Sequence, residues 1–135
     1  MEKTTYGDWK NCYRLSNGEM ELVVVTDIGP RIIRLGRPGG PNLLGELGPD
    51  VGEGDWRIYG GHRLWHAPEG LPRSYEPDNE QCEVETSADA VRVTAKTEPN
   101  ALIQKRMEIS LAEDDKCATI RHTLWNRSMW PVTLA

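Results

Sequence analysis

The stretch AVRVTAKTEPNALIQKRMEISL, residues 90–111, decides the fold. In its first half Val91 and Val93 alternate with Arg92 and Thr94, and the second half repeats the alternation after a Glu-Pro-Asn turn. A period of two is typical of a β-strand with one buried and one solvated face. The stretch therefore predicts two adjacent antiparallel strands.

Similar signals lie on both sides of this pair. Asn17-Gly18 is a hairpin signal, because both residues tolerate the positive φ of a tight turn. The first ten residues are polar, and we expect the start of this segment to be poorly ordered. Further strands are expected at 12–16, 19–26, 31–35, 42–44, 82–86 and 117–126, with another beginning at Trp130. No helical period appears, so the sequence predicts one all-β domain over residues 1–135, an antiparallel β-sandwich.

Composition limits the function classes. The 135 residues hold 16 Lys and Arg against 21 Asp and Glu, a formal net charge of −5, which disfavours nucleic acid as a partner. No apolar run reaches the roughly 20 residues of a membrane helix, and the N-terminus lacks the apolar core of a signal peptide. The three cysteines form no CxxC pair, and we interpret them as reduced thiols of a cytoplasmic protein.

The candidate site is the stretch WRIYGGHRLWHAPEGLPRSYEPDN, residues 56–79. It combines a Gly-Gly pair with aromatic rings and hydrogen-bonding side chains, the mixture that a binding floor for a sugar needs. Sugars present hydroxyl groups at their edges and C–H faces above and below. The residues that we expect to line one concave substrate-binding surface are His62, Arg63, Trp65, His66, Glu69, Tyr75, Asp78 and Asn79.

A metal site does not follow from this stretch. His62 and His66 are four residues apart, but the flanking glycines and Pro68 disfavour a helix. On a strand the two histidines would share a face about 13 Å apart, at roughly 3.3 Å per residue, too far for one zinc ion. His122, on a regular strand, has the pattern of a structural or surface histidine. The sequence predicts no metal and no cofactor.

Other readings of these residues stay open. His62 or His66 could carry protons, and Glu69, Glu76 and Asp78 could do acid–base work or be solvated loop acids. Residues 75–79 could close over a ligand or form a simple proline turn. Lys105 is an exception on the otherwise apolar face of its strand. An enzyme, a non-catalytic carbohydrate-binding domain and a structural β-domain are the three hypotheses.

Four segments, in this order, resemble the N-terminal half of the galactose mutarotase-like superfamily, the aldose 1-epimerase type of β-supersandwich. They are LSNGEMELVVVTDIGPRIIRLG (15–36), PNLLGE (41–46), YGGHRLWHAPEG (59–70) and LIQKRMEISLAEDDKCATIRHTLWNRS (102–128). The resemblance implies a carbohydrate ligand and, in a complete protein, interconversion of sugar anomers. The His-Gly-Gly order of true galactose mutarotases is absent.

The resemblance also implies that the family's catalytic histidine and glutamate follow the point where this chain ends. No catalytic residue is therefore assigned. We expect an N-terminal portion that needs a second half or self-association, and that is inactive as a mutarotase alone. Missing strands would leave apolar side chains such as Val23 and Val25 exposed.

Overall fold

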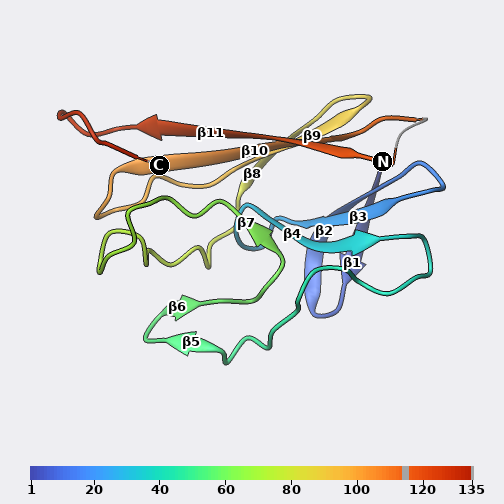
Figure 1. Cartoon of the computed structure of the whole chain (residues 1–135), viewed down its shortest axis with the longest axis horizontal. Helices are drawn as coiled ribbons and strands as arrows, with labels where there is room; N and C mark the ends of the chain where they lie inside the picture. The colour runs from blue at the N-terminus through green and yellow to red at the C-terminus, as the bar shows by residue number, and fades with distance from the viewer. Residues whose placement is uncertain (114–115, 135) are drawn as a thin grey trace.

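The computed structural model describes residues 1–113 and 116–134, which form two antiparallel sheets and a small hairpin (Figure 1). The fold prediction is confirmed: these residues are all-β, and every strand pair is antiparallel. The strands are β1 (Glu2–Tyr6), β2 (Trp9–Ser16), β3 (Glu21–Val25), β4 (Arg31–Gly36), β5 (Gly52–Glu53), β6 (Trp56–Arg57), β7 (His62–Arg63), β8 (Glu83–Thr86), β9 (Ala90–Thr94), β10 (Ile103–Leu111) and β11 (Ala118–Asn126).

The strand order of each sheet identifies its edge strands. The five-stranded sheet has the order β1-β2-β3-β4-β7, and the four-stranded sheet has the order β11-β10-β9-β8. The short strand β7 and the long strand β11 are therefore edge strands. The predicted hairpin at Asn17-Gly18 joins β2 to β3, and Gly18 has a φ of 89°.

The main core fills the space between the sheets. Leu22, Val24 and Ile32 from the five-stranded sheet pack with Val93 and Met107 from the other sheet. These side chains come from the alternating positions of their strands, as the period-two pattern requires. Burial of this apolar area, at about 25 cal/mol per Å², is what holds the two sheets together.

A second apolar cluster covers the outer face of the five-stranded sheet. Val23 and Val25 pack there with Ile33, Tyr59 and other residues of the loops. Both valines are buried, so the expectation that they are exposed is wrong. The long connection between β4 and β8, with β5 and β6 at its far end (Figure 1), contributes Tyr59 to this cluster, and Tyr6 and Trp9 pack against it.

Three local predictions are wrong. The first ten residues are ordered, because β1 pairs with β2 through a Gly7-Asp8 turn. Residues 42–44 are not a strand, since the Asn42 side chain itself accepts from Leu35 N–H and donates to the Ile33 carbonyl. Residues 130–134 contain no strand, and Ala135 lies outside the described residues.

The described residues include no helical segment that could span a bilayer.

Candidate functional site

Two glycines place the central segment of the site. Gly60 and Gly61 have φ values of 83° and 72°, a region that residues with a Cβ rarely adopt. A Cβ on Gly61 would collide with the carbonyl oxygen of Ile32 in β4. The close approach lets β7 pair with β4, with His62 opposite Ile32 and Arg63 opposite Arg31. His62 consequently faces the space between the sheets. Arg63 faces the outer layer, by which we mean the connection between β4 and β8 that lies outside the five-stranded sheet.

Arg31 is the fixed base of the outer layer. Its side chain is 0% exposed, and it donates to the carbonyls of Ile58 and Gly60 and to Asp78 Oδ2 at 2.8 Å. Its guanidinium also lies 5.4 Å from the ring centre of Tyr59. These contacts tie β4 to the Tyr75–Asn79 loop.

The guanidinium group of Arg63, unlike that of Arg31, lies against aromatic rings. Its guanidinium carbon lies 4.5 Å from the ring centre of Trp65 and 5.8 Å from that of Trp56, within the range of cation–π attraction. The nearest carboxylate oxygen, Asp78 Oδ2, is 3.8 Å from Arg63 Nε, which is too long for a hydrogen bond. Burial lowers the pKa of Arg63 from its ordinary value, and the Asp78 charge opposes that shift.

Three aromatic rings form one cluster beside Arg63. Trp56, Trp65 and Tyr75 meet edge to face, with ring centres 5.1–5.6 Å apart. The Tyr75 hydroxyl donates to Glu69, which raises the pKa of Tyr75. The mutual packing fixes the orientation of each ring.

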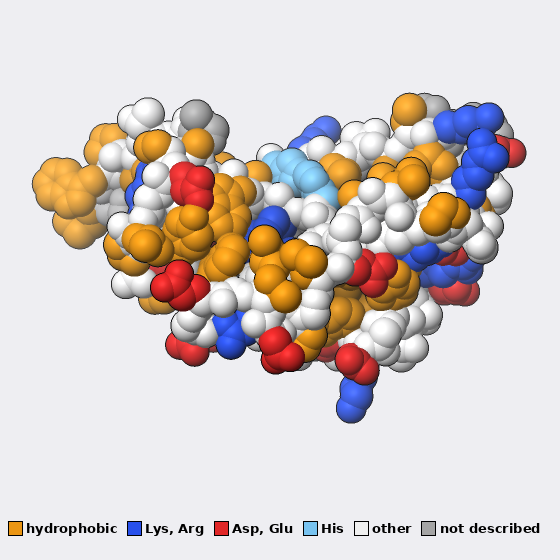
Figure 2. Space-filling view, turned by 60° about the horizontal axis from the view of Figure 1, so that its bottom comes forward, with side chains coloured by type: hydrophobic (Ala, Val, Ile, Leu, Met, Phe, Trp, Pro, Cys, Tyr) orange, Lys and Arg blue, Asp and Glu red, His pale blue; other side chains and the backbone are white. Residues whose placement is uncertain are grey.

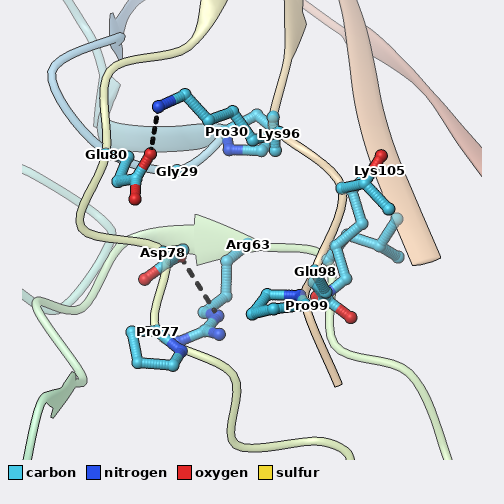
Figure 3. A pocket seen from close by; sticks show the side chains of 13 residues that line it. Gly29, Pro30, Arg63, Pro77, Asp78, Glu80, Lys96, Glu98, Pro99 and Lys105 are labelled. Carbon is cyan, nitrogen blue, oxygen red and sulfur yellow. Dashed lines mark ion pairs between the residues drawn. The ribbon is translucent and has the colours of Figure 1, made fainter. Parts of the chain in front are cut away.

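Arg63 separates two hollows. The polar cavity, about 250 Å³, is lined by Arg63, Asp78, Glu98 and Lys105 among others (Figure 3). The aromatic hollow, about 760 Å³, is lined by Arg31, Trp56, Arg63, Trp65, Glu69 and Tyr75 together with backbone and apolar groups. Ligand sites usually span roughly 300–1,000 Å³, so the aromatic hollow has the size for a ring and the polar cavity does not.

Two residues that line the polar cavity, Glu98 and Lys105, form a largely buried ion pair. Glu98 pairs with Lys105 and lies 3.5 Å from His66 Nε2. The His66 side chain is 0% exposed. Burial is the main cause that lowers the pKa of His66; Lys105 adds to the shift, and Glu98 opposes it.

Buried polar atoms without a hydrogen bond gather in this region. Within the part of the chain that the structure describes, eight buried side-chain nitrogen or oxygen atoms lack a hydrogen-bond partner, and all belong to six residues here. The atoms are Arg31 Nε, Trp56 Nε1, Arg63 Nε and Nη1, His66 Nδ1 and Nε2, Asp78 Oδ1 and Glu98 Oε2. Buried polar groups are nearly always paired in folded proteins, so such a concentration needs an explanation.

The structure distributes the eight predicted residues over several places. Trp65, Glu69 and Tyr75 line the aromatic hollow, Asp78 lines the polar cavity, and Arg63 lines both. The structure therefore does not bring all eight to one hollow. His62, His66 and Asn79 line neither hollow, because the alternation of β7 and the burial of His66 turn the histidines away.

Two residues of the predicted stretch have structural contacts. Asn79 accepts from the Tyr59 hydroxyl and donates to the Asp55 carbonyl. Glu76 is 4% exposed and accepts from the backbone N–H groups of Asn100 and Ala101. Glu76 therefore anchors a turn, and it lines neither hollow.

Sequence analysis missed four residues that border the site. Trp56 lies inside the stretch but was not selected, and Arg31 and Glu98 carry no local signal. Lys105 did carry one, since a lysine on an apolar face of a strand needs a buried partner, which the structure shows to be Glu98.

His62 has a partner that its spacing does not suggest. Its Nε2 lies 3.0 Å from Nε2 of His122 on β11, and the two ring centres are 5.1 Å apart. Burial lowers the pKa of both imidazoles, and His62 adds to the shift of His122.

Comparison of the chain with protein-family models, curated proteins and solved structures finds no match.

Proposed function

We propose that the chain binds a carbohydrate in the aromatic hollow, with Arg63 and Glu69 as hydrogen-bonding groups and Trp65 as a stacking surface. The observation that carries the proposal is that four of the eight buried atoms without a hydrogen bond belong to Arg31, Trp56 and Arg63, which line this hollow. A ligand rich in hydroxyl groups offers both donors and acceptors to such atoms.

The aromatic rings that line one side of the hollow also favour a sugar as the ligand. Trp56, Trp65 and Tyr75 are partly exposed and oriented by one another. A sugar ring has C–H faces that pack against aromatic rings while its hydroxyl groups reach Arg63 and Glu69 at the border. This combination supports a carbohydrate over a purely apolar ligand.

The charged side chains around the hollow favour an uncharged or weakly charged ligand. Arg31, Arg63 and Glu69 are the charged residues that line the hollow, and the charge of Arg31 is already paired with Asp78. The two signs nearly balance, so the site does not select strongly for an anion or a cation.

Anomer interconversion, which the resemblance to the aldose 1-epimerase type implies, needs one group to protonate the ring oxygen and one to remove the anomeric proton. Asp78 and Glu98 line the polar cavity, and the groups at the aromatic hollow that could carry a proton, Glu69 and Tyr75, are hydrogen-bonded to each other. We therefore propose binding, and not catalysis, for these residues.

We also propose a cytoplasmic location. Cys12 and Cys82 are buried, and burial raises the pKa of their thiols to about 11 and about 12, so both stay protonated and unreactive at neutral pH.

The test is ligand-observed NMR with glucose, galactose and their common derivatives, on the native chain and on Trp65→Ala. Removal of the Trp65 ring takes away the surface against which the sugar packs. We expect it to weaken binding by about tenfold or more, which corresponds to about 1.4 kcal/mol. Trp125→Ala is the matched control, because Trp125 is also a half-buried tryptophan beside two arginines, Arg106 and Arg127, but on the outward face of β11.

Equal affinity of the native chain and Trp65→Ala for every sugar would contradict the proposal, as would an equal loss in Trp125→Ala. Polarimetry on fresh α-glucose and α-galactose addresses catalysis separately. We expect the buffer rate, and faster mutarotation would show that these residues suffice for the reaction.

A further inference from the structure

The two imidazoles of His62 and His122 lie closer than ordinary packing requires. Their Nε2 atoms are 3.0 Å apart, and the ring planes are tilted by 47°. Among the residues that the structure describes, neither ring has another hydrogen-bond partner. The pair lies outside both hollows described above.

The pair bridges the two sheets at their open edges. His62 lies on β7, the last strand of the five-stranded sheet, and His122 lies on β11, the edge of the four-stranded sheet. Each is fixed by its strand register, His62 opposite Ile32 and His122 opposite Met107, and both point inward. Their backbones therefore hold the two rings in place independently of each other.

The pair is also accessible from solvent. Both histidines are partly exposed, whereas His66 is buried, and Figure 2 shows histidine atoms at the surface in the middle of one face. A small ion can reach the nitrogen atoms without any movement of the core.

We propose that His62 and His122 form a two-histidine site for a divalent transition-metal ion of the Ni²⁺ or Cu²⁺ type. Imidazole is a preferred ligand of these ions. With metal–nitrogen bonds of about 2.0–2.1 Å, nitrogen atoms 3.0 Å apart subtend roughly 90–95° at the metal. This angle fits neighbouring positions of a square-planar or octahedral ion better than the wider tetrahedral angle of zinc.

The site has only two protein ligands. The described residues contain no group of three or more His, Cys, Asp or Glu side chains arranged around one point. Water or an exogenous oxygen ligand therefore fills the remaining coordination positions. Neither imidazole donates to a carboxylate or carbonyl, the contact that usually strengthens a histidine ligand, so the affinity is moderate.

Metal binding here would link the two sheets. His66 is buried and is not part of this site. The sequence did not indicate that His122, on the other sheet, would lie next to His62.

The experiment is an isothermal titration of the untagged chain with Ni²⁺, in a Cys117→Ser background that removes the exposed thiol. We expect one ion per chain and at least a tenfold loss of affinity in His122→Gln. The glutamine amide can still hydrogen-bond to His62 but is a much poorer ligand. Thr123→Ala, on the outward face of the same strand, is the matched control and should bind as the parent does.

A second readout tests the bridge itself. Paramagnetic Cu²⁺ should broaden the backbone NMR signals of β7 and β11 together, and His62→Gln should abolish the broadening on both strands. If His122→Gln does not fold, His62→Gln carries the test. Equal affinities of the parent and a histidine variant, or broadening confined to one strand, would overturn the proposal.

Discussion

The sandwich core and the outer layer treat buried polar groups in opposite ways. In β2, β3, β9 and β10 every buried side chain is apolar or has a partner, as Lys105 has with Glu98. Residues 56–80, with the neighbouring Arg31 and Glu98, hold all eight unpaired buried atoms of the described chain. Stability and recognition are therefore assigned to different layers of one small domain.

Arg31, which is buried, and Arg63, which is partly buried, show this contrast on neighbouring strands. Arg31 has three hydrogen-bond acceptors, whereas Arg63, its cross-strand partner, is surrounded by rings and has no hydrogen bond. Arg31 is part of the scaffold. Arg63 retains donors for a ligand.

The largest effect is expected for Arg31→Met. Loss of the guanidinium leaves Asp78 and two carbonyls without their donor, and breaking a buried pair in this way costs about 3–5 kcal/mol. Urea denaturation should show it as a large drop in the free energy of unfolding. Arg121→Met, at an exposed position of β11, should change that free energy by less than about 0.5 kcal/mol.

A similar but slightly smaller effect is expected in the apolar core. Met107 is 0% exposed between the sheets, so Met107→Ala should lower the free energy of unfolding by about 2–5 kcal/mol. Met129, which is 90% exposed, provides the same substitution without burial, and Met129→Ala should be nearly neutral. Equal effects of the two variants would contradict the assignment of the core.

Gly61→Ala tests the backbone that joins the two layers. A φ of 72° and the collision with the Ile32 carbonyl should cost about 1–3 kcal/mol. Because the shift moves Arg63, sugar affinity should also fall. Gly70→Ala meets open space at an ordinary φ and should leave both measurements unchanged, as thermal unfolding and NMR titration can show.

The sequence predicted the sandwich well because the signal there is local. The alternation in residues 90–111 defines β9 and β10, and the Asn17-Gly18 turn defines the β2–β3 hairpin. Strand assignment failed at residues 42–44, where an asparagine side chain replaces backbone pairing, and at the N-terminus, where polar residues pair all the same.

The site was predicted less completely because its geometry depends on distant residues. Arg63, Trp65 and Tyr75 were identified from their density in one stretch. The division into two hollows depends on Arg31 and Glu98, from strand β4 and the β9–β10 connection. The contact of His62 with His122 joins residues 60 positions apart and has no sequence signal at all.

The most direct test of the central claim is Arg63→Met, measured for both stability and sugar binding. A largely buried charge that makes no hydrogen bond and lies 3.8 Å from its nearest carboxylate contributes little to stability, and a well-packed apolar replacement can be neutral or stabilising. We expect the free energy of unfolding in urea to stay within about 1 kcal/mol of the native value or to rise, while sugar binding by ligand-observed NMR is lost. A loss of stability as large as that of Arg31→Met, or retained sugar affinity, would contradict the division between scaffold and site.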